Sequence, residues 1–551
     1  MRLSNFFLAA LLFFSVLLRL VDLGRIPNGL TVDEADMGYN AYSILKTGKD
    51  VYGRSFPMFF QSLDDYKPGF AIYASIPAIR LLGLSEYSIR LFPAIIGALT
   101  PLLFFVFLKM LYPKNNYAAF SVFLLTTFAP WNVAISRATF MYIELVFFLL
   151  LALITFFLGI KNKNFPIYIS ACIFAFTLYV YYAALIYIPL IGIILFIFFK
   201  KELLAKKKNL IIASVLFLVI SAPALSHYLN GSARSRFNAI SLFTPDISLP
   251  VSIQEIETDN KSNNKLFNFY HNRRIINVSN TLDNYFDYLN MDYLFVNSKN
   301  IRYFYINYYG LFYFLEFPFL LIALHKIIKK RESNDLFLLA LLLISPIPAA
   351  ITLGSPFVHR AILLPMVLQI LIALGLAKFL KSFQASYFQK PIYYSIAALY
   401  LISAVGFIHQ YFVHNPKEFS TEKDNGAWFS SVKEAIPQLN LYKQKYPTVV
   451  FTWSSTKLVP GIYYLFYSKI DPTLVQNKSA KWTNESPSFR QIYNEVGNVQ
   501  FRPIDWKADS QLKNTLFIGY PSDFQKDDDI HTISKTYDQD GKEHFWFVTK
   551  D

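Results

Sequence analysis

The stretch "FFLAALLFFSVLLRLVDLGRIPNGLTVDEADMGYNAYSILKTGKD" (residues 6–50) joins a long apolar run to a loop with three carboxylates, Asp33, Glu34 and Asp36. Each carboxylate would cost about 2.5–3.5 kcal/mol at the centre of a bilayer, so the three must lie outside the hydrocarbon. The apolar run lacks a small-residue cleavage site and many similar runs follow it, which predicts a retained anchor rather than a signal peptide. The sequence therefore begins with a predicted span and an acidic outer loop.

Composition extends this interpretation to the whole chain. Of 551 residues, 54% are hydrophobic and only 16% are charged, which is typical of a polytopic membrane protein. The single cysteine, Cys172, excludes an internal disulfide and thiol–metal clusters. Eleven windows are long enough to cross about 30 Å of hydrocarbon, and residues 69–83 could add a re-entrant or interfacial helix; the windows are 6–22, 88–108, 117–135, 141–160, 165–182, 184–199, 209–227, 303–325, 336–353, 361–380 and 391–411.

The distribution of charge predicts the topology. Alternate connections between the spans, together with Arg2, hold 17 Lys and Arg against three acidic residues, so they should face the cytoplasm. The N-terminus is then cytoplasmic, and the outer loops are 23–87 and 228–302. Residues 413–551 carry 17 basic and 17 acidic residues, so the net charge of +15 belongs to the membrane part. We therefore expect no nucleic-acid partner.

The C-terminal part changes character. Its apolar runs shorten to strand length at 448–453, 515–520 and 543–550, and residues 425–439 and 459–469 have the pattern of amphipathic helices. We expect a transmembrane domain of about 11 helices over residues 1–412, followed by a small extracytoplasmic α/β domain over 413–551. The latter contains no catalytic motif.

Further polar side chains gather at the predicted outer ends of the spans. They are Asp64, Asp65 and Lys67 in the first outer loop, Arg137, Tyr181, Tyr182, His359 and Arg360. Taken singly, each has a structural interpretation: cations and tyrosines at span ends are typical membrane anchors, and paired aspartates often form a solvated turn. The adjacent Asp33 and Glu34 fit such a role less well, because they directly follow the first span.

Several motifs, in order along residues 6–412, resemble the bacterial branch of the GT-C glycosyltransferases. They are "DEADMGYNAYSILKTGKD", "YKPGFAIY", "SIRLFPAIIGALTP", "PWNVAISRATF", "LYVYYAALIYIP" and "SPFVHRAILLP". This branch is similar to protein O-mannosyltransferases and to the aminoarabinose transferase of lipid A. The resemblance implies a multi-pass protein of the bacterial plasma membrane. It also implies inverting transfer of a hexosyl or pentosyl group from a polyprenyl-phosphate donor to a hydroxyl of a protein, lipid or cell-wall glycan, on the extracytoplasmic face.

The resemblance also implies roles for residues. An acidic residue of the first outer loop serves as base, and Lys67 stands where such enzymes carry a lysine in a "KPP"-like motif, here "KPG". Asp33 is the candidate base, with Glu34 orienting it or the acceptor. Lys67 is the first candidate to bind the donor phosphate, and the others are Arg137, His359 and Arg360.

Other contacts stay open. Asp64, Asp65, Tyr181 and Tyr182 could contact the substrate, and the carboxylates suit Mg²⁺ or Mn²⁺, so a divalent metal is an alternative that the sequence does not decide. The sequence has no Gly-rich phosphate loop between a strand and a helix.

Two other functions compete. A transporter or flippase for a lipid-linked or anionic substrate would place ionisable residues in the middle of spans, whereas most charges here lie at span ends. A receptor whose C-terminal domain binds a wall polymer would leave eleven spans as a mere anchor. The sequence therefore favours the transferase.

Overall fold

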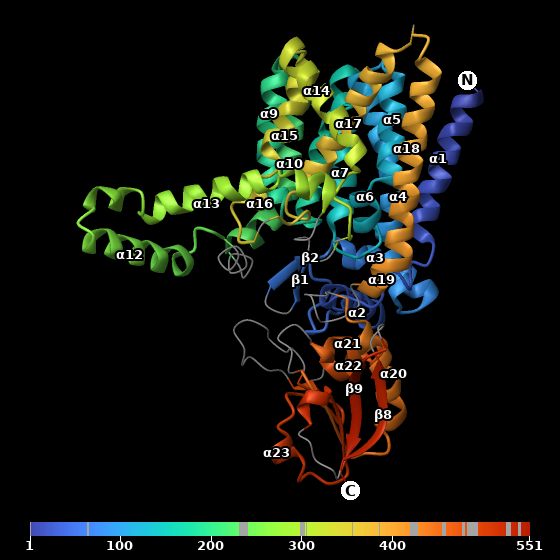
Figure 1. Ribbon diagram of the computed structural model, residues 1–551, viewed down its shortest axis with the longest axis vertical. Coiled ribbons are helices and arrows are strands. Elements are labelled where there is room, and N and C mark those ends of the chain that lie inside the picture. The colour runs from blue at the N-terminus through green and yellow to red at the C-terminus, as the bar shows by residue number, and fades with distance from the viewer. Residues whose placement is uncertain are drawn as a thin grey trace. The chain divides into compact units, whose positions relative to one another are not determined.

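The computed structural model describes residues 2–62, 65–162, 164–230, 241–297, 304, 306–354, 356–384, 386–418, 428–453, 459–476, 480–481, 494–524, 530–537 and 541–550. The chain forms two compact units, shown in Figure 1. Unit 1 comprises Met1–Leu18, Ile96–Ser136 and Met141–Ile408, and unit 2 comprises Arg19–Ile95, Arg137–Phe140 and His409–Asp551. Three long helices contribute residues to both units: α1 (Arg2–Leu20), α4 (Glu86–Leu111) and α18 (Gln389–His409).

Unit 1 is helical. Besides its parts of α1, α4 and α18 it contains α5 (Asn116–Phe128), α6 (Pro130–Ser136), α7 (Tyr142–Lys161), α8 (Tyr168–Phe176), η1 (Thr177–Tyr179), α9 (Ala184–Ala205), α10 (Lys207–Asn230), α12 (Pro245–Lys261), η2 (Lys265–Phe269), α13 (Arg273–Asp287), η3 (Asp292–Val296), η4 (Phe314–Glu316), α14 (Phe317–Lys330), α15 (Ser333–Ile344), α16 (Ile347–Ala350) and α17 (Leu363–Ser382). Helix α17 lies at its centre, where it packs against α5, α14 and α15.

Seven helices of the described chain are long and apolar enough to cross a membrane, or eight if the bent pair α5 and α6 is one span. Helices lie in all eleven predicted windows, but those in the windows 6–22, 165–182 and 303–325 are shorter. A multi-pass helical fold is thus confirmed, and the count of eleven stays a prediction. The predicted helix at 69–83 is also present, as α3 (Phe70–Leu82).

The outer surface of these helices has the character of a lipid-facing surface. Only 17% of the apolar window in Lys207–Leu229 and 11% of that in Gln389–Glu418 are buried, although both are strongly apolar. A water-soluble protein rarely exposes so large an apolar surface, whereas lipid tails cover it without cost.

Unit 2 begins with the segments that follow α1. They are α2 (Val32–Thr47), the antiparallel hairpin β1 (Phe59–Ser62) and β2 (Asp65–Pro68), and α3, which packs on α2. Helix α2 starts at the N-cap Thr31, whose hydroxyl accepts a hydrogen bond from the Glu34 amide while the Glu34 side chain accepts from the Thr31 amide. It ends at Gly48, which has a φ of +70° that favours glycine.

The C-terminal residues form a seven-stranded mixed sheet in the order β4-β5-β6-β3-β7-β9-β8. Its strands are β3 (Thr448–Phe451), β4 (Ala480–Lys481), β5 (Glu495–Val496), β6 (Val499–Phe501), β7 (Thr515–Gly519), β8 (His531–Tyr537) and β9 (Glu543–Thr549). Strand β3 pairs in parallel with β6 and β7, and the other pairs are antiparallel. The three strands predicted from sequence correspond to β3, β7 and β9.

Helices complete this part of unit 2: α19 (Asn415–Glu418) after the turn η5 (Gln410–His414), α20 (Ser430–Tyr442), α21 (Pro460–Tyr467), α22 (Pro472–Gln476), α23 (Trp506–Asp509) and η7 (Pro521–Asp523). The predicted helices at 425–439 and 459–469 correspond to α20 and α21. One core cluster of the sheet consists of Val450, Trp506, Phe517, Phe524 and Val548.

The C-terminal segments pack directly on the first loop. Helix α2 packs against α21 and α22, and the Tyr39 hydroxyl donates to the carbonyl of Ile470 at 3.0 Å. The amide of Phe429 and the hydroxyl of Tyr463 both donate to the carbonyl of Leu30, at 3.1 and 3.2 Å. The last segment of unit 2 begins at His409, and the predicted domain boundary at 412 stays a prediction. The sequence does not predict, however, that unit 2 also includes residues 19–95.

A substitution at Gly29 can test this packing. The φ of +87° at Gly29 disfavours other residues, and an added Cβ would lie 2.7 Å from the amide nitrogen of Ser430. Gly53 has a similar φ of +80° but no atom within 4 Å of its Cβ position. We expect Gly53→Ala to cost about 1–2 kcal/mol of stability for left-handed backbone alone, and Gly29→Ala to cost more. Apparent melting temperatures of the purified variants compare the two, and equal losses would contradict a tight contact at Gly29.

Candidate active site

The first two turns of α2 present two of the three carboxylates, Asp33 and Asp36, to one partner. Asp33 and Asp36 are three residues apart on the helix, so their side chains lie on the same face. The Asp33 side chain is 36% exposed, whereas that of Asp36 is 2% exposed. One carboxylate therefore reaches solvent and the other is buried.

The partner is Lys67, which β2 carries into the same place. In the hairpin Lys67 stands opposite Phe60, and its side chain is only 5% exposed. Its Nζ donates to Asp33 Oδ1 and to Ser62 Oγ, each at 2.6 Å, and lies 3.6 Å from Asp36 Oδ2. We call Asp33, Asp36, Ser62 and Lys67 the lysine cluster.

Burial and charge act in opposite directions in the lysine cluster. Burial alone would lower the pKa of Lys67, but the charges of Asp33 and Asp36 raise it above its ordinary value, so the ammonium form is stable. Burial raises the pKa of Asp36, and Lys67 opposes that effect. The Asn40 amide further fixes Asp36 by donating to its Oδ1 at 3.2 Å. The cluster thus holds a buried ammonium beside a carboxylate that reaches solvent.

Glu34, the third carboxylate, has a different environment. It is fully buried, and its Oε1 and Oε2 accept hydrogen bonds from Nε and Nη2 of Arg90 at 2.9 and 3.0 Å. Oε1 also accepts from the amide of Thr139 at 3.1 Å. A base that touches substrate needs an accessible oxygen, so this geometry supports the orienting role of Glu34 rather than direct proton transfer.

Arg90 uses its remaining donors on the backbone before α2. Its Nη1 donates to the carbonyls of Leu23 and Pro27, and its Nη2 donates to that of Gly29 at 2.5 Å. The indole of Trp428 lies against the guanidinium, 5.3 Å from its ring centre. One side chain thereby fixes the segment that leads into the helix of Asp33.

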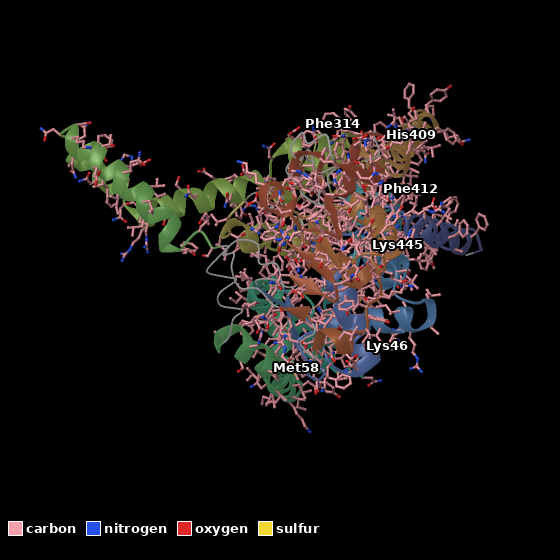
Figure 2. The ribbon with its side chains drawn as sticks, turned by 90° about the horizontal axis from the view of Figure 1, so that it is seen from below. Lys46, Met58, Phe314, His409, Phe412 and Lys445 are labelled. Atoms are coloured by element: carbon pink, nitrogen blue, oxygen red, sulfur yellow. The ribbon has the colours of Figure 1, made fainter. Side chains whose placement is uncertain are left out.

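The guanidinium of Arg137, a predicted phosphate ligand, also forms contacts within the protein. It is fully buried, and its Nη2 donates to the carbonyls of Val21 and Ile26 at 2.7 and 2.9 Å. The central carbon of the guanidinium lies 4.8 Å from the ring centre of Phe412, a residue labelled in Figure 2. Burial lowers the pKa of Arg137. The contacts described give it a structural role, and phosphate binding by Arg137 stays a prediction.

The other predicted residues belong to unit 1, where they form a group of their own. His359 stacks on Tyr142 at 4.9 Å, and Tyr181 meets the same ring edge-on at 5.0 Å, with Tyr182 beside Tyr181. Arg360 lies over Phe357 at 4.8 Å and donates to the carbonyl of Leu353.

Asp64 lies outside the described residues, as does the side chain of Asp65. Within the described part of the chain, no group of three or more His, Cys, Asp or Glu side chains could hold a metal ion. In the lysine cluster an ammonium already occupies the space between the two carboxylates. The described residues therefore do not form a metal site.

Sequence reasoning missed four residues of this site. Asp36 is part of the quoted acidic stretch, and its spacing of three residues from Asp33 would place both side chains on one face of a helix. The pattern Thr31-x-x-Glu34 could likewise have predicted a capping box. The contact of Ser62 with Lys67 depends on the register of the β1–β2 hairpin, which no single residue indicates. Arg90 carries no local signal, because its partner Glu34 lies 56 residues away.

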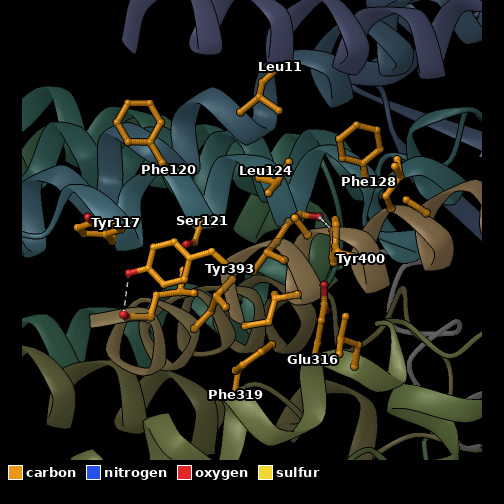
Figure 3. Close-up of a pocket in the computed structure, with 18 of the residues that line it drawn as sticks. Leu11, Tyr117, Phe120, Ser121, Leu124, Phe128, Glu316, Phe319, Tyr393 and Tyr400 are labelled. Carbon is orange, nitrogen blue, oxygen red and sulfur yellow. Dashed lines mark hydrogen bonds between the residues drawn. The ribbon is translucent and has the colours of Figure 1, made fainter. Parts of the chain in front are cut away.

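Unit 1 also contains an apolar cavity of about 790 Å³ between α1, α5, α14, α17 and α18 (Figure 3). Its walls are mainly Phe, Leu, Ile and Ala, and Figure 3 shows the side chain of the buried Glu316 pointing toward Tyr400. The Tyr400 hydroxyl donates to the carbonyl of Leu125 at 3.3 Å. Such a lining suits an apolar chain rather than a sugar, and it includes none of the predicted site residues.

Comparisons with known proteins agree with the sequence-based resemblance. Residues 68–227 match the family model of dolichyl-phosphate-mannose-protein mannosyltransferases. No curated protein matches the sequence of the chain.

Solved structures match over nearly the whole chain. ArnT from Cupriavidus metallidurans in the apo state has a TM-score of 0.54 at 13% identity, over 99% of this chain and 98% of ArnT. The same protein bound to undecaprenyl phosphate has a TM-score of 0.52 at 13% identity, over 99% of this chain and 97% of ArnT. The apo oligosaccharyltransferase of Archaeoglobus fulgidus has a TM-score of 0.50 at 14% identity, over 84% of this chain and 63% of that one. The predicted GT-C resemblance, to mannosyltransferases and ArnT, is thus confirmed at the level of fold.

Loss of the Glu34 charge should unfold the site rather than disable its chemistry alone. Glu34→Gln leaves the Arg90 guanidinium buried without a counter-charge, and breaking a buried pair in this way costs about 3–5 kcal/mol. We expect a clearly lower apparent melting temperature. Glu257→Gln, at an exposed position of α12, is the matched control and should melt like the unmodified protein. Equal melting of both variants would show that the pair contributes nothing to stability.

Proposed function

We propose that this protein is an integral-membrane glycosyltransferase that moves a sugar from a polyprenyl-phosphate donor to a hydroxyl acceptor on the extracytoplasmic face. The observation that carries the proposal is the lysine cluster, in which a buried ammonium lies 2.6 Å from a half-exposed carboxylate. Transfer from a lipid phosphate needs a base for the acceptor and a cation for the leaving group, and this cluster supplies both.

The comparisons support the donor class. The matching family model describes mannosyltransferases that use dolichyl-phosphate-mannose, and ArnT was solved with undecaprenyl phosphate. A lipid phosphate is an already activated leaving group, which agrees with the absence of a nucleotide-binding motif from the sequence. The apolar cavity of unit 1 offers a lipid chain a suitable surface.

In the proposed step, Asp33 accepts the proton of the acceptor hydroxyl as its oxygen attacks the anomeric carbon. The bond from that carbon to the phosphate oxygen breaks on the opposite face, its electron pair leaves with the lipid phosphate, and the sugar configuration inverts. Lys67 stabilises the negative charge that grows on the phosphate, which lowers the barrier because that charge is largest in the transition state.

Asp36 serves as a positioning residue in this mechanism. When Asp33 takes a proton, it loses its negative charge and its contact with the Lys67 ammonium weakens. The ammonium can then direct a donor to the phosphate. Asp36 Oδ2, 3.6 Å from Nζ, and Ser62 then keep the buried ammonium in place. Arg360, His359, Tyr181 and Tyr182 stay proposed donor or substrate contacts on the basis of the resemblance alone.

Replacing Asp33 should abolish most transfer without unfolding the protein. Asp33→Asn keeps the shape but cannot take the proton, and base catalysis contributes typically 10²–10⁴-fold, so turnover should fall by about that factor. Radiolabelled sugar transferred from polyprenyl phosphate per molecule of monodisperse enzyme measures it. Glu257→Gln should retain full activity. Near-normal turnover of Asp33→Asn would exclude Asp33 as the base, and no transfer by the unmodified enzyme from any such donor would overturn the function itself.

Replacing Lys67 should lower turnover even when the donor is saturating. Removing one preorganised donor to a developing negative charge costs roughly 2.7–4 kcal/mol, so Lys67→Met should reduce turnover about 10²–10³-fold. Lys67→Arg should recover part of it, because a planar guanidinium keeps the charge but not the compact shape of the ammonium. The same assay measures both variants. Unchanged turnover of Lys67→Met would show that Lys67 only anchors the loop.

A further inference from the structure

Helix α13 carries an apolar stripe that no described protein segment covers. Val278, Leu282 and Phe286 are 55, 52 and 62% exposed, and with the half-buried Ile275 they repeat at helical spacing along one face; Leu289, 38% exposed, follows in the turn after the helix. The exposed polar residues Asn280 and Asp287 lie on the side of the helix turned away from this stripe. The helix is therefore strongly amphipathic, with its apolar face outward.

Its second half is attached to a candidate span. The Asn284 side chain donates to the carbonyls of Ala350 and Thr352 at 3.2 and 3.0 Å, and the Tyr285 hydroxyl donates to that of Leu343 at 2.8 Å. Leu343 is itself 55% exposed on the apolar span Ser333–Ala350. The stripe on α13 thus starts beside the lipid-facing surface of that span.

The rest of the hairpin has the composition of a membrane interface. Figures 1 and 2 both show the green hairpin of α12 and α13 extending sideways from the other helices, and α13 packs against α16. The turn between them exposes the aromatic side chains of Phe267, Phe269 and Tyr270, at 52, 66 and 61%. Arg273 and Arg274 follow directly and suit lipid phosphates. Aromatic residues and cations of this kind mark the headgroup level of a bilayer.

We propose that the α12–α13 hairpin lies in the lipid interface, with the apolar stripe of α13 among the upper acyl chains and its polar side toward water. The partner is the bilayer, because the stripe continues a lipid-facing span and the aromatic and basic residues at the tip match its headgroup zone. The hairpin would hold unit 1 at a fixed depth where the spans end. This attachment is independent of sugar transfer.

The test compares two faces of the same helix in nanodiscs. In a Cys172→Ser background, Leu282→Cys and Asn280→Cys each receive an environment-sensitive fluorophore, and the lipids carry bromine near the top of their acyl chains. We expect blue-shifted emission that bromolipids quench strongly at position 282, and red, unquenched emission at position 280. Phe286→Cys provides a second stripe position if Leu282→Cys yields no folded protein.

Two results would overturn the proposal. Red, unquenched emission at positions 282 and 286 would place the stripe in water. Blue-shifted emission that bromolipids do not quench would mean that protein, from a partner or a second copy of this chain, covers it. The result does not depend on transferase activity, so its failure would leave the proposed function untouched.

Discussion

The geometry of the site depends on the buried ion pair between Glu34 and Arg90. Two charges are costly to bury unless every polar atom around them finds a partner. Here Arg90 also binds three carbonyls of the segment 23–29, and Glu34 also binds the amides of Thr31 and Thr139. These contacts join α4, residues 23–29 and the start of α2. The pair is stable because both side chains also form hydrogen bonds to the backbone of several elements. The same hydrogen bonds fix where α2 begins.

The orientation of α2 then decides which carboxylate is accessible. Successive residues of a helix point about 100° apart, so Asp33 and Glu34 cannot face the same environment. Once Glu34 turns inward to Arg90, Asp33 and Asp36 turn toward the β1–β2 hairpin and Lys67. Adjacent acidic residues that look equivalent in the sequence thus acquire different roles through a single buried contact.

The sequence predicts the parts that local patterns encode. The apolar helices and the strands β3, β7 and β9 follow from the periodicity and length of the apolar runs. The resemblance to known enzymes also points to Asp33 and Lys67, which the structure brings within 2.6 Å of each other, and their roles stay predictions. The sequence does not predict Arg90, whose apolar neighbours in α4 suggest only a span. Nor does it predict the packing of α21 and α22 on α2, because such contacts join residues more than 400 positions apart.

In the proposed mechanism, two carboxylates for one lysine reconcile stability with reactivity. A buried ammonium needs a counter-charge that stays beside it during the reaction, and the buried Asp36 is placed to supply one. A base must instead reach the acceptor, as the half-exposed Asp33 can, but each proton it accepts removes its negative charge from Lys67. With Asp33 alone the buried ammonium would lose its counter-charge during the reaction, and with Asp36 alone the acceptor would find no accessible base. The spacing of three residues on one helix satisfies both requirements with the least rearrangement, because both side chains already face the same nitrogen.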